Sequence, residues 1–259
     1  MAASACAGRP AHLELPAGAG RPWPDAVQAW AASVAGCRGV RTISAEVGFS
    51  GRAGRQAIRG RALVGLAPGA LRLEGIAPFG PPAFILVSKA DRTTLLLPRE
   101  PAVLDTREAA PVLEALVGVA MGPDDLRAAL SGCVVPRPEA QAGRTFDQTT
   151  AVVDLAGGAT AFLKRQPGGG WRVFAARREG WQIEYAWGSG RLPDRVRLWR
   201  DRSAGVTPVD VSAALSQVDV NIDLGDEVFR VDVPREAKPI SVDDLRAAGP
   251  LGDGGRRPR

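Results

Sequence analysis

The side chains that most often carry catalysis are sparse in this sequence. Its only histidine, His12, lies in a segment rich in proline and glycine. This nearly removes histidine-based acid–base chemistry, Ser-His-Asp triads and zinc sites. Ser50, Ser88 and Ser131 lack the surroundings of a turn that presents a catalytic serine. We therefore expect no enzymatic activity, no cofactor and no bound metal.

Two glycine runs and two acidic pairs could in principle serve phosphate binding or proton transfer. Gly157-Gly158 and Gly168-Gly169-Gly170 lie between strand patterns, and neither is followed by the lysine and hydroxyl residue that open a phosphate-binding helix. We interpret both as hairpin turns. The pairs Asp124-Asp125 and Asp243-Asp244 begin predicted helices, where carboxylates are favoured by the helix dipole. That role accounts for them better than catalysis.

Cys6 follows the small residues Ala3-Ser4-Ala5. This order resembles a lipobox, the end of a bacterial lipoprotein signal, in which the cysteine becomes the acylated first residue. Ala3 stands where leucine is commonest, and the residues before Cys6 are too few for the basic and apolar parts of a signal. The lipoprotein interpretation therefore requires sequence upstream of Met1. The alternative is a chance cysteine in a disordered leader.

Cys37 ends one predicted helix and Cys133 follows another. In an exported protein such a pair is a candidate disulfide. The two cysteines do not form a CxxC motif, which argues against a redox site.

The chain has 259 residues and a formal net charge of +5. This length can bury one sizeable core. No apolar run is long enough to span a bilayer. A basic excess can indicate nucleic acid or an anionic membrane, but here arginines alternate with apolar residues, as on the solvated face of a sheet. We therefore expect no nucleic-acid partner.

Three parts are expected along the chain. Residues 1–21 are rich in alanine, glycine and proline and predict a flexible leader that carries Cys6. Residues 22–247 predict a single domain. Residues 248–259 predict a disordered tail.

Two amphipathic helical regions are predicted. The first covers residues 25–35 and ends at Gly36, with apolar residues at helical spacing. The second covers residues 109–131 and is broken at Gly118 or Gly122.

Most other segments show the two-residue alternation of half-buried strands. Strand patterns with local turns fill residues 40–105, and Pro136–Gly143 is a polar link. The later candidates are Gln148–Leu155, Ala159–Arg165, Trp171–Ala176, Gly180–Trp187, Arg195–Arg200, Ala213–Leu224 and Glu227–Val233. Together they predict an α+β fold with one antiparallel sheet of about ten or eleven strands. A sheet this long curls, so helices over its apolar face could enclose a cavity; the alternative is a fully packed core.

The connection Gly75–Leu86 joins two apolar strands through Pro78, Phe79 and Gly80. Its prolines exclude a helix and a central strand. Phe79 at the tip either folds back onto the core or forms an exposed hydrophobic finger for a membrane or an acylated partner. We expect the exposed position.

The order of elements and three motifs resemble the LolA/LolB family of bacterial lipoprotein carriers and receptors, closest to its outer-membrane receptor LolB. The matching motifs are Pro78-Phe79-Gly80, the segment from Met121 to Gly132, and Trp181-Gln182-Ile183-Glu184-Tyr185. The resemblance covers roughly residues 25–235. The second half matches loosely, and this chain is longer and richer in glycine than the enterobacterial form.

The resemblance implies an incomplete β-barrel whose helical lid covers an apolar cavity for acyl chains. Cys6 would be the lipid anchor, and Phe79 would replace the exposed leucine of the membrane-insertion loop. The candidate cavity and lid residues are Trp30, Val34, Val47, Phe49, Leu113, Leu116, Leu126, Leu130, Trp181 and Ile183.

We therefore expect a monomeric lipoprotein of the cell envelope, on the outer membrane and facing the periplasm. It would receive acylated lipoproteins or related lipids, from a periplasmic LolA-like carrier, and help insert them into the outer membrane. The alternatives are a general lipid-binding lipoprotein and a structural lipoprotein of the same fold.

Overall fold

A computed structural model describes residues 12–135, 138–202 and 207–248. The predicted lipid anchor Cys6 and nearly all of the predicted tail, residues 249–259, lie outside the described residues.

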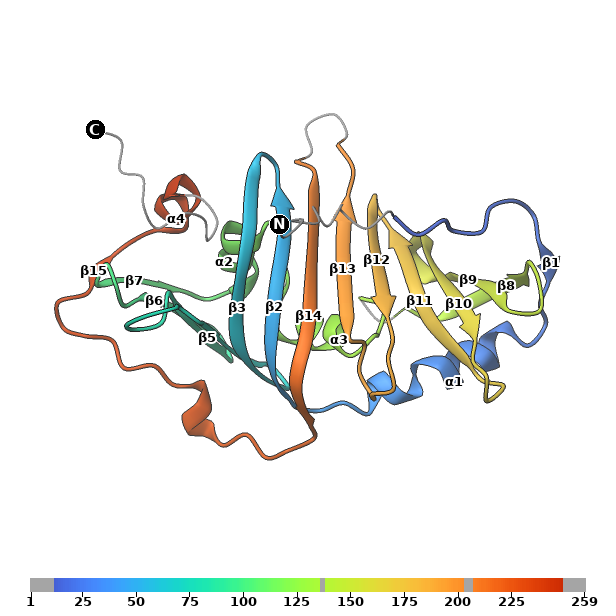
Figure 1. Cartoon of the computed structure of the whole chain (residues 1–259), viewed down its shortest axis with the longest axis horizontal. Helices are drawn as coiled ribbons and strands as arrows, with labels where there is room; N and C mark the ends of the chain where they lie inside the picture. The colour runs from blue at the N-terminus through green and yellow to red at the C-terminus, as the bar shows by residue number, and fades with distance from the viewer. Residues whose placement is uncertain (1–11, 136–137, 203–206, 249–259) are drawn as a thin grey trace, which may run out of the picture.

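The architecture is a single large antiparallel sheet with a few helices (Figure 1). Its strands in the first half of the chain are β1 (Arg21–Pro22), β2 (Ile43–Ala53), β3 (Gln56–Ala67), β4 (Ala70–Gly75), β5 (Ile85–Lys89), β6 (Arg92–Leu97) and β7 (Ala102–Thr106). Those in the second half are β8 (Ala140–Thr145), β9 (Thr150–Leu155), β10 (Ala159–Arg165), β11 (Trp171–Arg178), β12 (Trp181–Ala186), β13 (Arg195–Arg200), β14 (Val209–Val220) and β15 (Lys238–Pro239).

The strand order is β1-β8-β9-β10-β11-β12-β13-β14-β2-β3-β4-β5-β6-β7-β15. Each half of the chain is a meander, and β14 returns to pair with β2, which joins the halves into one sheet. All pairings are antiparallel except the short β15–β7 pair. The sheet curves but does not close, which confirms the predicted α+β fold with an unclosed curved sheet.

The helices are α1 (Ala26–Arg38), α2 (Ala109–Val117), α3 (Pro123–Leu130) and α4 (Val242–Ala248), with short 3₁₀ turns η1 (Ala156–Gly158) and η2 (Asp226–Phe229). In Figure 1, α2 and α3 lie behind the middle strands. Helix α1 packs against β8, β9 and β11, at the other end of the sheet. The covered face therefore has two parts, one under α1 and one under α2 and α3.

Both predicted helical regions form, with different ends. Helix α1 continues through Gly36 to Arg38. The second region breaks at Gly118, whose left-handed backbone (φ 77°) ends α2. A Cβ atom at Gly118 would lie 2.5 Å from the Cβ of Ala53 on β2, so glycine also permits the close approach of this turn to the sheet.

The described residues form fifteen strands instead of the ten or eleven predicted. Two of them, β1 and β15, are two-residue edge pairings that leave no periodic pattern. The predicted polar link Pro136–Gly143 was wrong in part, because residues from Ala140 onward form β8 and pair with β9.

The predicted strand Glu227–Val233 is also wrong. This segment contains the 3₁₀ turn η2 and runs across the outer face of the sheet, where Phe229 packs on Ala70 and Val87. Arg72 donates hydrogen bonds to the carbonyl oxygens of Val228 and Arg230. These bonds and the burial of Phe229 replace the ladder that a strand would need.

The part of the predicted leader from His12 onward lies against the outer face of the sheet. The His12 ring lies 4.0 Å from that of Trp199, and the amide of Leu13 donates to Glu184 at 3.4 Å. Leu15 packs on the outer-face cluster that contains Phe162. These contacts differ from the free tether expected of an aperiodic segment.

Candidate functional site

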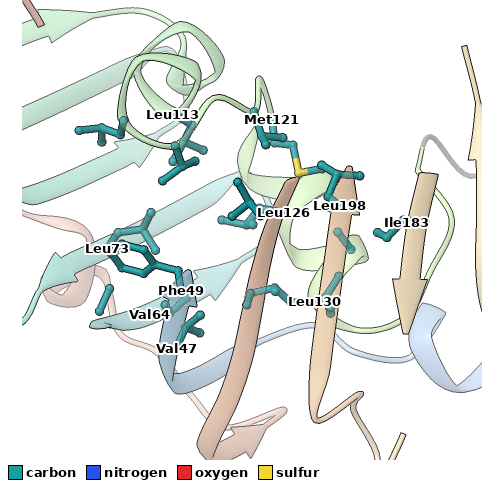
Figure 2. A pocket seen from close by; sticks show the side chains of 18 of the residues that line it. Val47, Phe49, Val64, Leu73, Leu113, Met121, Leu126, Leu130, Ile183 and Leu198 are labelled. Atoms are coloured by element: carbon teal, nitrogen blue, oxygen red, sulfur yellow. The ribbon is translucent and has the colours of Figure 1, made fainter. Parts of the chain in front are cut away.

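An apolar cavity lies between the middle of the sheet and helices α2 and α3 (Figure 2). Its volume is about 140 Å³. All nineteen lining residues are apolar: Val47, Phe49, Ala62, Val64, Leu73, Phe84, Leu113, Leu116, Val117, Val119, Met121, Leu126, Ala129, Leu130, Ile183, Val196, Leu198, Val211 and Ala213.

The cavity follows from two periodicities. Inward residues of β2, β3, β12, β13 and β14 alternate with outward ones and form its floor, because side chains two apart in a strand share a face. Leu113 of α2 and Leu126 of α3 point into it from the helices as its roof (Figure 2), and Leu116 of α2 also lines it. Gly118 turns the chain between the two helices, so the connection containing Val119 and Met121 closes one side.

The structure brings seven of the ten predicted cavity residues together: Val47, Phe49, Leu113, Leu116, Leu126, Leu130 and Ile183. Trp30 and Val34 do not line the cavity, because α1 covers β8, β9 and β11. Trp181 faces the same side as Ile183 but lies at the end of β12, beyond the cavity. Helical periodicity identifies a buried face without indicating which strands that face covers.

Sequence reasoning missed several lining residues on the later strands, among them Val196, Leu198, Val211 and Ala213. Their two-residue spacing along β13 and β14 is the signal that would have found them. Met121 and Val119 carry no such signal, because they lie in the connection between two helices.

Helix α3 is tied to the connection between α1 and β2 by a buried arginine. Arg127 donates at 2.6 Å to the carbonyl oxygen of Val40 and at 2.6 Å to Asp124. Asp124 also accepts from the amide of Gly69 in the β3–β4 turn at 3.3 Å. The carboxylate at this helix start therefore has the structural role that the sequence suggests.

The segment after α3 is fixed by a disulfide. Cys37 of α1 and Cys133 are joined, with their Cα atoms 5.6 Å apart. The Tyr185 hydroxyl donates to the carbonyl oxygen of Cys133 at 2.7 Å. Burial raises the pKa of Tyr185 far above its ordinary value, so this hydroxyl stays protonated.

Phe79 lies at the tip of the β4–β5 connection with 88% of its surface exposed. Arg99 donates to the carbonyl oxygens of Phe79 at 2.5 Å and Pro81 at 3.4 Å. Phe84 in the same connection is 3% exposed and lines the cavity. One end of this loop thus carries an exposed aromatic side chain on a backbone that Arg99 contacts, and the other end is part of the cavity wall.

A second hollow of about 440 Å³ adjoins the cavity, since both are lined by Val119, Met121, Ile183 and Leu198. We call it the mouth. Its further lining includes the arginines Arg177, Arg178 and Arg200, the carboxylates Glu114, Asp125 and Glu179, and Trp181.

The outer face of β12–β14 carries a buried charge cluster that sequence reasoning assigned to solvent. Arg197 makes two hydrogen bonds to Asp210, at 2.9 and 2.8 Å, and its Nη1 lies 3.9 Å from a Glu184 carboxylate oxygen. The hydrogen bonds to Asp210 raise the pKa of Arg197, and the nearby charge of Glu184 adds to this. A groove of about 980 Å³ beside it has mixed polar and apolar walls.

Among the described residues, no group of three or more histidine, cysteine or carboxylate side chains could hold a metal ion. Within the same part of the chain, no helix combines the length and apolar character needed to cross a membrane.

The sequence matches no protein-family model and no curated protein. Solved structures do resemble it. A LolA superfamily protein from Nitrosomonas europaea aligns with a TM-score of 0.52 at 13% identity, over 80% of this chain and 98% of that one. A Vibrio parahaemolyticus domain named for outer-membrane lipoprotein sorting aligns with a TM-score of 0.50 at 12% identity, over 80% of this chain and 96% of that one. The chain therefore has a LolA-like fold.

Proposed function

We propose that this protein is a non-enzymatic lipoprotein of the cell envelope that holds acyl chains of lipoproteins or lipids in the apolar cavity. The observation that carries the proposal is the uniformly apolar lining between the sheet and helices α2 and α3. Affinity for the ligand would come from burial of its acyl chain, at about 0.8 kcal/mol for each methylene. The LolA-like fold supports this assignment.

The small size of the cavity means that part of its wall would have to move before an acyl chain can enter. A cavity of about 140 Å³ accepts a ligand about the size of benzene, which is much smaller than a full acyl chain. Loading would therefore move the roof formed by α2, α3 and their connection. The connection around Met121 is the part best suited to move, because Asp124 and Arg127 hold α3 and the disulfide holds the segment that follows it.

The finer proposal is that the protein receives acylated lipoproteins from a LolA-like carrier and helps insert them into the outer membrane. Phe79 would enter the bilayer, and acylated Cys6 would anchor the chain. The exposure of Phe79 supports this role for the loop, because an aromatic side chain that is already outside the core can enter a membrane without disturbing the fold.

The first experiment tests acyl binding. The chain is analysed by native mass spectrometry and lipid extraction. Ala213→Phe fills the cavity from β14, whereas Ala214→Phe makes the same change on the opposite face of that strand. We expect non-covalently bound acyl species on the wild type and on Ala214→Phe, and their loss on Ala213→Phe. A wild type that neither carries acyl species nor takes up added fatty acid would refute the proposal.

The second experiment tests insertion. Phe79→Glu should leave acyl loading intact and reduce delivery of a lipoprotein to vesicles. Unchanged delivery would favour a general lipid-binding lipoprotein without transfer activity.

A further inference from the structure

The inner face of the sheet changes character where the cavity meets the mouth. Across β11, β12 and β13, Ala176, Ile183 and Leu198 form one row of paired residues, and the last two line the cavity. Two residues further along each strand, the next row on the same face is Arg178, Trp181 and Arg200. An apolar row is thus followed directly by a row with two guanidinium groups around an indole.

Arg200 is the most distinctive member of this row. Its guanidinium carbon lies 4.2 Å from the centroid of the Trp181 ring, and its Nη2 donates to the carbonyl oxygen of Thr207 at 3.2 Å. Its Nε is buried without a hydrogen-bond partner. Within the described residues, no carboxylate forms an ion pair with Arg200. A guanidinium without a carboxylate partner among the described residues therefore lines the mouth, stacked on an aromatic ring that orients its plane.

The other charges of the mouth leave this position open to an anion. Arg178 pairs with Glu179 at 3.3 Å, but that carboxylate is 74% exposed, so the pair is weak and exchangeable. Glu114 on α2 pairs with Arg246 of α4 at 3.3 Å. Asp125 belongs to α3, so Glu114 and Asp125 both lie on the helical side, opposite the arginines of the sheet.

We infer that the mouth binds the anionic headgroup of an amphiphile whose acyl chains occupy the cavity, with a phosphate group against Arg200 and Arg178. This inference rests on the proposed function, because the chains must lie in the cavity for the headgroup to reach the mouth. Planar guanidinium groups suit phosphate, since they offer paired donors at matching spacing. The site would thus select anionic lipids over uncharged ones with the same chains.

The test compares two lipids that differ only in the phosphate, a diacylglycerol phosphate and the diacylglycerol with identical chains. We expect the wild type to bind the phosphate form at least about tenfold more tightly. Arg200→Gln should remove that preference without weakening diacylglycerol binding. Arg195→Gln, an equal charge change on the opposite face of β13, should alter neither affinity. Arg200→Lys should keep part of the preference, because it keeps the charge.

Equal affinity of the wild type for the two lipids would overturn the headgroup inference alone. Failure of both lipids to bind would overturn the proposed function as well as the headgroup inference. Loss of both affinities in Arg200→Gln, with unchanged thermal unfolding, would also contradict the inference. Inorganic phosphate at millimolar concentration should not displace the lipid. A different result would be displacement of the lipid by phosphate, together with phosphate binding to the lipid-free wild type but not to lipid-free Arg200→Gln. That result would overturn the inference and show that the site serves a free anion.

Discussion

Tyr185 of β12 and Cys133 after α3 are joined inside the core by a hydrogen bond of 2.7 Å. Cys133 is also linked to Cys37 of α1. The segment after the cavity roof is therefore fixed to the sheet and to the helix at the other end of the molecule. The proposed movement on loading therefore falls on the α2–α3 connection and not on this anchored segment.

Tyr185 is the only tyrosine of the chain, so the ultraviolet absorbance of tyrosinate reports it directly. Because burial raises its pKa in the folded state, the unfolded chain loses this proton first as the pH rises. The titration of Tyr185 therefore leaves the free energy of unfolding unchanged at pH values below its ordinary pKa of 10.0 and lowers it at higher pH. We expect tyrosinate absorbance to appear together with loss of circular dichroism. Ionisation near pH 10 with the fold intact would contradict the buried position.

The disulfide closes a long loop, since its cysteines are 96 residues apart. Replacing Cys37 by alanine should lower the free energy of unfolding by about 2–4 kcal/mol. Urea unfolding of wild type and variant measures this difference. Thiol titration of the unfolded wild type, produced so that Cys6 is not acylated, provides the control: of its three cysteines, one should react before reduction and all three after it. Three reactive thiols before reduction would rule out the Cys37–Cys133 bond.

Phe79 and Phe84 form a matched pair within one connection. Phe79→Ala should change the free energy of unfolding by less than about 0.5 kcal/mol, because the side chain is 88% exposed. Phe84→Ala should cost about 3–5 kcal/mol, because it removes part of the cavity wall. Chemical denaturation measures both changes in the free energy of unfolding. In a separate experiment, co-sedimentation of Phe79→Glu with vesicles tests whether this side chain contacts a membrane. A large loss of stability in Phe79→Ala would show that this side chain belongs to the core.

The sequence predicted the elements whose periodicity is regular and local. Alternation placed Val47, Phe49 and Ile183 on the covered face, and the helical spacing of Leu113 and Leu116 placed them over it. The assignment of helix to strands was not predictable in this way, because it depends on β14 pairing with β2 across the whole chain. That is why Trp30 and Val34 were wrongly expected at the cavity.

The outer face could be predicted least. Glu184 and Arg197 occupy outward positions of regular strands, which indicated solvent, yet both are buried. Residues from Leu13 onward cover part of this face, and the segment around Phe229 covers another. Neither segment has a periodic pattern, so nothing in its residue spacing predicted these contacts.

The central claim is that acyl chains enter the apolar cavity and not the larger groove on the opposite face. Photo-crosslinking with a fatty acid that carries a diazirine near the end of its chain, followed by peptide mass spectrometry, tests this most directly. We expect adducts on cavity residues such as Met121, Leu126 and Ile183. Adducts confined to the outer groove, on residues such as Leu13 and Phe174, would contradict it.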